Sequence, residues 1–196
     1  MNYLAHLFLA GKDEGLIIGN FIADSVRGKE INNYSENIQR GIRLHRKIDA
    51  FTDNHPIVKL TTSRLRRSSA KYAPVVTDIV YDHFLAANWD KYSQITLNTF
   101  AIESYRILHN NLHNMPVKIH ELYLTMEEQN WLVNYSSIKG ITQTLTELSA
   151  KVKFANTMAT AIIDLEKEYD LFKEDFLTFF PFVQEYVKLE MKNPSL

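Results

Sequence analysis

The 196-residue chain contains no cysteine, and this absence restricts its chemistry. A protein without cysteine has no disulfides, no thiolate metal ligands and no cysteine nucleophile. Any metal site must therefore use nitrogen and oxygen ligands. Because no disulfide framework indicates an extracellular protein, we expect an intracellular, cytoplasmic location.

Glycine and proline are scarce as well, with six and five residues in the chain. Strand-rich folds need turn residues at intervals of roughly 8–12 positions, and this chain has too few of them. Hydrophobic residues make up 45% of the chain and charged residues 23%, which is an ordinary globular composition. The sequence therefore predicts an all-α fold, a multi-helix bundle in a single domain over residues 1–196.

Long hydrophobic runs are missing too. No stretch is apolar for the roughly 18 residues that a membrane-spanning helix needs, and the first residues lack the basic segment and cleavage site of a signal peptide. The net charge of -1 argues against non-specific nucleic-acid binding over the whole surface, and no nucleic-acid-binding module is recognisable. We expect neither a membrane nor a nucleic acid as partner, and the sequence carries no signal of oligomeric state.

Charge is present but unevenly distributed along the chain. Residues 26–71 contain eleven basic and four acidic residues, a net charge of +7. Residues 121–196 contain seven basic and twelve acidic residues, a net charge of -5. The nearly neutral total therefore combines a basic region with an acidic one.

Hydrophobic periodicity of the helical kind recurs along the chain. Ser35 is expected to cap one helix, Pro56 and Pro74 to open two others, and Pro181 to kink the last. Helices are predicted at about 14–26, 35–51, 57–72, from 74 past 85, 95–113, 119–135, 138–150, and from about 155 onward.

His45 and Asp49 lie four residues apart in one predicted helix, so both side chains share a face. They could bind a shared metal, or one could orient the other. The alternative is an ordinary His–Asp pair on a solvated face. Ile48 and Phe51 indicate that part of this helix is packed, which favours the metal site.

Asp82 and His83 stand in an apolar setting, residues 80–85 (VYDHFL). A charged aspartate is costly to bury there unless it is paired or bound to a metal. A functional role for the pair is favoured, and the alternative is that Asp82 caps or forms a salt bridge while His83 fills core. Asp24 ends another apolar stretch. His6 lies in LAHLFL, where a single histidine is more often a core residue than a ligand.

The chain has no glycine-rich phosphate loop and no Gly-x-Ser-x-Gly motif. What it offers is a His/Asp set with arginines nearby. A bound metal can activate water at neutral pH, and cations stabilise the charge that develops on a phosphoryl group. This combination favours hydrolysis of a phosphoester.

Several blocks of sequence resemble the bacterial acyl carrier protein phosphodiesterase family. They are residues 1–6 (MNYLAH), Gly19-Asn20 with Ala23-Asp24, Arg27-Gly28, residues 41–53 (GIRLHRKIDAFTD), 81–85 (YDHFL) and 131–135 (WLVNY). The resemblance runs over nearly the whole chain and is densest over residues 1–85. It implies an all-α fold distantly related to the HD phosphohydrolases, although Asp82-His83 reverses the His-Asp order that names that superfamily.

The resemblance also implies a reaction and a cofactor. A Mn²⁺-dependent enzyme would remove 4′-phosphopantetheine from a serine of holo-acyl carrier protein, with Fe²⁺ or Mg²⁺ as alternative metals. Arg46, and with it Arg43, would stabilise the phosphoryl oxygens, and Asn20 would bind the phosphate or orient a ligand. The pool of metal ligands is His6, Asp24, His45, Asp49, Asp82 and His83.

Acyl carrier proteins are strongly acidic, so the basic stretch could dock one, with Arg64, Arg66 and Arg67 as the contact residues. The alternative is that these cations pair with the acidic C-terminal helices of the same chain. Two other functions stay open: a hydrolase of a small phosphate ester or nucleotide at the same metal site, and a catalytically silent protein that binds the carrier.

Overall fold

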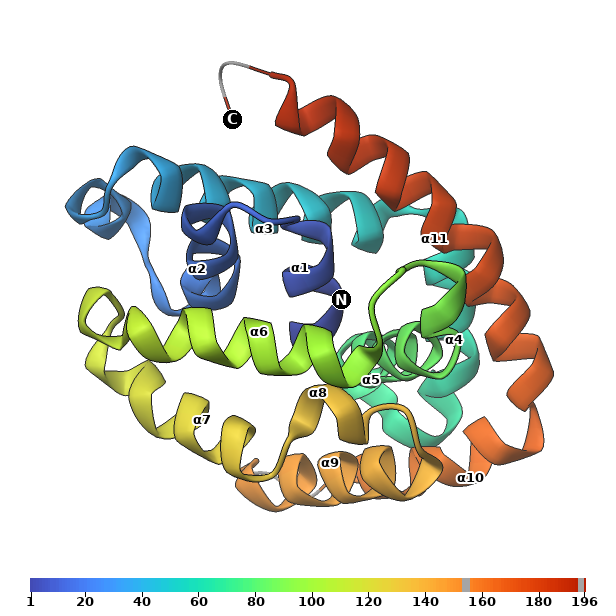
Figure 1. Cartoon of the computed structure of the whole chain (residues 1–196). Coiled ribbons are helices and arrows are strands. Elements are labelled where there is room, and N and C mark those ends of the chain that lie inside the picture. The colour runs from blue at the N-terminus through green and yellow to red at the C-terminus, as the bar shows by residue number, and fades with distance from the viewer. Residues whose placement is uncertain (153–155, 194–195) are drawn as a thin grey trace.

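The computed structural model describes residues 1–152, 156–193 and 196, and these residues contain helices and no β-strand (Figure 1). The predicted all-α fold is confirmed. The α-helices are α1 (Tyr3–Leu9), α2 (Glu14–Ile22), α3 (Glu36–Asn54), α4 (Pro56–Ser69), α5 (Ala73–Ala87), α6 (Leu97–Asn110), α7 (Val117–Glu128), α8 (Trp131–Asn134), α9 (Ile138–Lys151), α10 (Ala161–Lys167) and α11 (Tyr169–Met191).

Most of the predicted helices are confirmed to within a few residues, and the differences have local causes. The helix predicted over 14–26 ends at Ile22, where a 3₁₀ turn (Ala23–Ser25) follows. The helix predicted over 119–135 is divided into α7 and α8, because Asn130 adopts a left-handed conformation with φ of +48°.

The C-terminal helix also differs from the prediction. Its expected start near 155 lies outside the described residues, and Glu168 separates α10 from α11. α11 contains Pro181 and continues as a helix to Met191. Ser35 precedes α3 as predicted, but its side chain makes no capping hydrogen bond.

α1 has no counterpart among the predicted helices, and Figure 1 shows it in the middle of the molecule. Five of its seven residues are buried: Leu4, Ala5, His6, Leu7 and Leu9. A short helix that is buried around most of its circumference lacks the polar face on which helical periodicity depends.

α2 and α3 pack unusually closely, through two glycines. A Cβ atom added to Gly19 would lie 2.2 Å from the carbonyl oxygen of Ile38, and one added to Gly41 would lie 2.6 Å from that of Leu16. Only glycine allows the two backbones to approach this far. The contact positions Asn20, at the next residue of α2, beside the middle of α3.

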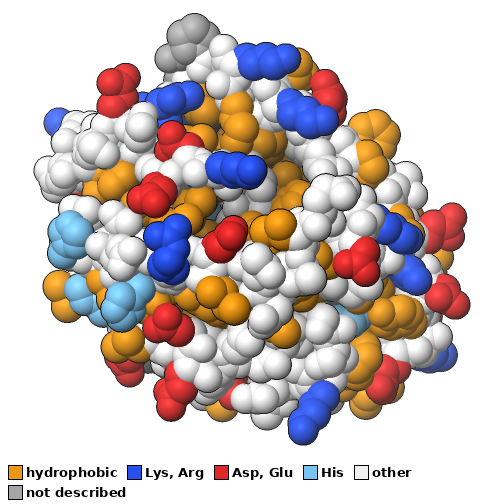
Figure 2. Space-filling model, in the orientation of Figure 1, with side chains coloured by type: hydrophobic (Ala, Val, Ile, Leu, Met, Phe, Trp, Pro, Cys, Tyr) orange, Lys and Arg blue, Asp and Glu red, His pale blue; other side chains and the backbone are white. Residues whose placement is uncertain are grey.

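α11 runs along one side of the molecule and joins the acidic end of the chain to its basic part (Figure 1). The carboxylate of Asp175 pairs with Arg64 of α4, and Thr61 donates to the same oxygen over 2.8 Å. Lys47 of α3 contacts Glu190 at 2.5 Å. Figure 2 accordingly shows basic and acidic side chains interspersed on the face in view.

Among the described residues, no helix combines the length and the apolar character that crossing a membrane requires.

Candidate metal centre

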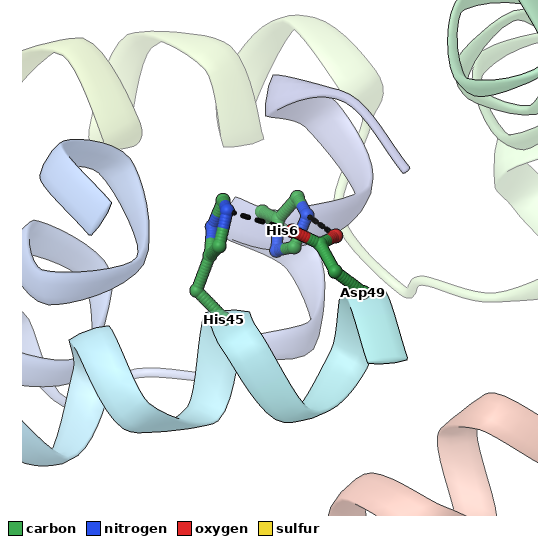
Figure 3. Close-up of side chains that lie close together, drawn as sticks. All are labelled: His6, His45 and Asp49. Atoms are coloured by element: carbon green, nitrogen blue, oxygen red, sulfur yellow. Dashed lines mark hydrogen bonds and ion pairs between the residues drawn. The ribbon is translucent and has the colours of Figure 1, made fainter. Parts of the chain in front are cut away.

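Three side chains from α1 and α3 converge at one point (Figure 3). The carboxylate of Asp49 contacts both imidazoles, with Oδ1 3.0 Å from Nε2 of His6 and Oδ2 3.1 Å from Nε2 of His45. The two rings stack with their centroids 3.8 Å apart. One potential ligand atom from each residue lies within 4.8 Å of the other two. This spacing suits a single cation.

Asp24 extends this cluster on the solvent side. It belongs to the 3₁₀ turn after α2, and its Oδ1 lies 3.3 Å from Nε2 of His45. Its side chain is 82% exposed, whereas those of His6 and His45 are buried. The structure therefore brings together four of the six predicted ligands: His6, Asp24, His45 and Asp49.

Within the described part of the chain, the imidazole of His45 has no hydrogen-bond partner, although it is buried. Its Nε2 lies within ion-pair distance of Asp24 and Asp49, but the angles do not fit a hydrogen bond. Buried polar atoms without a partner are rare in folded proteins and call for an explanation such as an unseen ion. A cation between His45 and the two carboxylates would provide Nε2 with a partner.

Asn20 fixes the orientation of His6. Its Nδ2 donates to the carbonyl of Leu16 over 3.1 Å, so its Oδ1 faces Nδ1 of His6, 3.2 Å away. An amide oxygen only accepts hydrogen bonds, so Nδ1 of His6 carries the proton. In the neutral ring, the lone pair of Nε2 then faces an oxygen of Asp49, and a cation between these two acceptors would remove the conflict.

The charges of the cluster influence one another strongly. Burial, reinforced by the charge of His45, lowers the pKa of His6 to about 4. Burial acts in the same direction on His45, but Asp24 and Asp49 outweigh it and raise its pKa to about 9. Burial would raise the pKa of Asp49, yet the two histidines hold it well below its usual range. The carboxylate of Asp49 is thus ionised at neutral pH, as a ligand must be, whereas His45 is protonated and releases its proton when a metal binds.

These donors fit a divalent cation. The cluster offers two imidazole nitrogens and carboxylate oxygens from Asp24 and Asp49, a donor set that suits Mn, Fe or Zn. Two further observations favour a bound cation: the nitrogens of His45 make no hydrogen bond, and two acceptor atoms of His6 and Asp49 face each other.

Asp82 lies outside this cluster, because its two oxygens bind the first turn of α1. Oδ1 accepts from the backbone N–H groups of Asn2 and Ala5, both at 3.2 Å, and Oδ2 accepts from that of Leu4 at 2.7 Å. Burial raises the pKa of Asp82 to about 7, against the pull of the ammonium group of Met1 and these amides. Asp82 thus caps α1, which is the alternative that the sequence left open.

His83 also lies apart from the cluster. Its Nδ1 donates to the carbonyl oxygen of Tyr135 over 2.8 Å, and its Nε2 accepts from the hydroxyl of Tyr169 over 2.9 Å. Both ring nitrogens are therefore engaged in the core, and neither is free to bind a metal. His83 thus packs in the core, which is the alternative to a metal ligand that the sequence left open.

The two predicted phosphate-binding arginines lie on α3. The guanidinium of Arg46 is exposed and donates to the carbonyl of Val26 over 2.8 Å, two residues after Asp24. Arg43 donates to Gln39 over 3.3 Å, and its Nε is buried without a partner. Arg46 is therefore anchored beside the segment that carries Asp24.

Of the three arginines predicted to dock a partner, two pair within the chain. The side chain of Arg64 is 18% exposed and is bound to Asp175, so it is not available to a partner. Arg67 lies 3.6 Å from Glu168 but is 74% exposed, and Arg66 is exposed as well. Pairing with the acidic C-terminal helices therefore accounts for Arg64 and in part for Arg67.

Sequence reasoning missed Asp78, which lies beside the cluster on α5. Its Oδ1 accepts from the buried ammonium group of Met1 over 2.9 Å, and the same group lies 3.8 Å from Asp49. Asp78 precedes Asp82 by four residues, so the spacing places both on one face of α5. That spacing was the signal that could have found it.

Comparison with known proteins finds relatives over nearly the whole chain. The model of the family described as "Acyl carrier protein phosphodiesterase" matches residues 1–183. The protein named acyl carrier protein phosphodiesterase from Photorhabdus laumondii is 34% identical over 194 residues, which cover 98% of this chain and 97% of that protein. The proteins of the same name from Pectobacterium atrosepticum and Serratia proteamaculans are each 30% identical, over 97% and 96% of this chain and 99% and 98% of their own lengths. No solved structure matches the chain.

Proposed function

The chain belongs to the acyl carrier protein phosphodiesterase family, and we propose that it hydrolyses the phosphodiester that joins 4′-phosphopantetheine to a serine of holo-acyl carrier protein. The products are apo-carrier protein and 4′-phosphopantetheine. The relatives' shared name supports the substrate. The observation that carries the proposal is the convergence of His6, His45 and Asp49, with both nitrogens of His45 lacking a hydrogen-bond partner.

We further propose that this cluster holds a divalent metal, with Mn²⁺ as the preferred ion. His6, His45 and Asp49 would bind it from the buried side, and Asp24 from the side open to solvent. A metal bound at such a site polarises a phosphoryl oxygen and makes water nucleophilic at neutral pH. Because Asp24 is exposed, a phosphodiester can reach the metal from this side without a rearrangement of the core.

The remaining residues of the site position charges and ligands. Asn20 holds His6 with Nε2 directed at Asp49, which keeps the ligand geometry fixed during turnover. Arg46, anchored on the carbonyl of Val26, would stabilise the negative charge that develops on the non-bridging phosphoryl oxygens. Its exposure leaves it free to approach a bound phosphate.

The central experiment incubates the purified protein with holo-carrier protein and Mn²⁺ and follows the intact mass of the carrier. The carrier should lose the mass of one 4′-phosphopantetheine, and the protein should contain stoichiometric metal. Asp49→Asn should abolish both properties. Asp53→Asn, an exposed aspartate one turn further along α3, is the matched control and should keep them. An unchanged carrier mass with metal confirmed bound would refute the proposal.

Contact with the carrier can be tested separately. Because Arg64 is engaged with Asp175, Arg66 and the exposed part of Arg67 are the residues of this group that remain available for an acidic partner. Arg66→Glu should raise KM for holo-carrier protein and leave the turnover of bis(p-nitrophenyl) phosphate, a small diester, unchanged. A hydrolase of small phosphate esters would instead be indifferent to this change with either substrate.

A further inference from the structure

A second cavity opens beside the metal cluster, and its position suggests what it binds. It has a volume of about 350 Å³, which falls in the range of roughly 300–1,000 Å³ typical of ligand sites. It shares four residues, Met1, Asn2, Tyr3 and Asp24, with the small pocket that contains His6, Asn20 and His45. A ligand bound at the cluster could therefore extend into this cavity without leaving the protein.

The walls of the cavity are largely apolar. They include Ile79 of α5, Leu122 of α7, Trp131 of α8 and Leu148 of α9. Tyr3 and Trp131 both line the cavity, with ring centroids 6.4 Å apart. Trp131 is half-buried and its indole N–H donates to Gln129 over 2.8 Å, so the ring is held in place.

The polar groups that line the cavity include the carboxylates of Asp24, Asp78 and Glu147. Asn2 lies near the cluster, where its side-chain amide donates to the hydroxyl of Tyr135 over 3.2 Å, and Thr144 and Glu147 lie on α9. Lys151 is the one basic side chain among the lining residues, and the ammonium group of Met1 is already paired with Asp78. The cavity therefore suits an uncharged chain with a few amide and hydroxyl groups better than a second phosphate.

We propose that this cavity binds the pantetheine arm of the substrate, with the phosphate at Asp24 and the thiol end toward α9. The arm is uncharged beyond its phosphate and combines a dimethyl-substituted carbon with two amides and a hydroxyl, which matches walls that combine apolar side chains with hydrogen-bonding groups such as those of Asn2, Thr144 and Glu147. The inference rests on the proposed function and deepens it: the enzyme recognises the arm as well as the carrier protein.

The two tryptophans of the chain provide a direct test of binding. Trp131 lines the cavity, whereas Trp89 is buried elsewhere and donates to the carbonyl of Ile95 over 2.8 Å. In a ¹⁵N–¹H spectrum of the protein loaded with Mg²⁺, which is diamagnetic and does not broaden nearby signals, the indole peak of Trp131, assigned with Trp131→Phe, should shift and saturate as pantetheine is added. The peak of Trp89 should stay in place. A stationary Trp131 peak would overturn the inference.

A second experiment measures hydrolysis. Leu148→Phe narrows the cavity and should raise KM for holo-carrier protein about tenfold, while turnover of bis(p-nitrophenyl) phosphate, which has no arm, stays at the wild-type rate. Ile102→Phe is the matched control, because exposed Ile102 lines a separate cavity between α6 and α7. It should change neither the KM for holo-carrier protein nor the turnover of bis(p-nitrophenyl) phosphate.

The outcomes separate the two proposals. If the wild type releases the arm from the carrier but Leu148→Phe keeps the wild-type KM, the cavity does not bind the arm and the proposed function stands. If the wild type leaves the carrier intact, the proposed function fails, and the pantetheine titration alone decides whether the cavity binds the arm.

Discussion

Asp82 fixes the position of His6 without touching it, because it holds the first turn of α1. Three backbone N–H groups point at its two oxygens. The change Asp82→Asn leaves one oxygen that can accept a hydrogen bond, and it places an NH₂ group against the backbone N–H groups of α1, with which it cannot bond. We expect the free energy of unfolding to fall by about 1–3 kcal/mol, with metal still bound in the folded protein.

Urea denaturation and metal analysis check this prediction together. Asp90→Asn, an exposed aspartate after α5, is the control and should change neither quantity. If Asp82→Asn instead lost its metal at unchanged stability, Asp82 would be a ligand and not a cap.

His83 leads to a prediction about pH. The ring is buried between the carbonyl of Tyr135 and the hydroxyl of Tyr169, and burial lowers its pKa even though the carbonyl acts in the opposite direction. The unfolded chain therefore takes up a proton near pH 6.5 while the fold does not. Stability from this residue is present above that pH and declines as the pH falls below about 6.5.

Comparison with His83→Gln isolates this contribution, because all other groups titrate in both proteins. The wild type should be the more stable at pH 8, and its advantage in urea denaturation should shrink at pH 5.5. An advantage that stays constant or grows on acidification would contradict a buried neutral His83.

The sequence could name these two residues but could not assign their roles. An apolar setting shows that Asp82 needs a partner, and a metal or an N–H group would serve equally well. The N–H groups that serve it are 77 to 80 residues away. By contrast, the spacing of His45 and Asp49 within one helix was sufficient to predict that their side chains meet, because both lie on the same face of α3.

At the scale of the helices, the contact between α2 and α3 sets the geometry of the site. Gly41→Ala would place a methyl group 2.6 Å from the carbonyl oxygen of Leu16, so the helices must separate. Overpacking of this kind costs about 1–3 kcal/mol. Because Asn20 and His6 lie on one side of this contact and His45 on the other, we expect metal affinity to fall more than stability alone explains.

Ala50→Gly provides the control for this prediction. It lies on the exposed face of α3 and costs about 1 kcal/mol through helix propensity, without moving α2. Metal titration of both variants under native conditions should show weakened binding for Gly41→Ala only. Equal affinity in the two variants would mean that the close contact does not position the ligands.

Helix positions were predicted well because most helices have one buried face, and periodicity reports such faces. The sequence did not predict α1, because this helix is buried on most sides. It did not predict the division of α7 from α8 either, because that division depends on the left-handed backbone of Asn130. Both features position residues of the proposed sites. α1 carries His6, and α8 carries Trp131 of the adjoining cavity.

At the scale of the whole molecule, the candidate metal site connects parts of the chain that are distant in sequence. His6 comes from α1, Asp24 from the turn after α2, and His45 and Asp49 from α3. The unfolded chain has no such site, so a cation that binds here stabilises only the folded state. At a Mn²⁺ concentration 100 times Kd, this linkage adds about 2.7 kcal/mol to the free energy of unfolding.

For a chain of this length, 1 kcal/mol corresponds to roughly 2–4 °C in Tm, so saturating Mn²⁺ should raise Tm by about 5–10 °C. Differential scanning calorimetry of the metal-free protein and of the Mn²⁺-loaded protein measures the shift. Asp53→Asn should respond as the wild type does, and Asp49→Asn should not respond. Because the shift requires a preformed site, its absence in the wild type at saturating Mn²⁺ would show that His6, His45 and Asp49 meet for structural reasons alone.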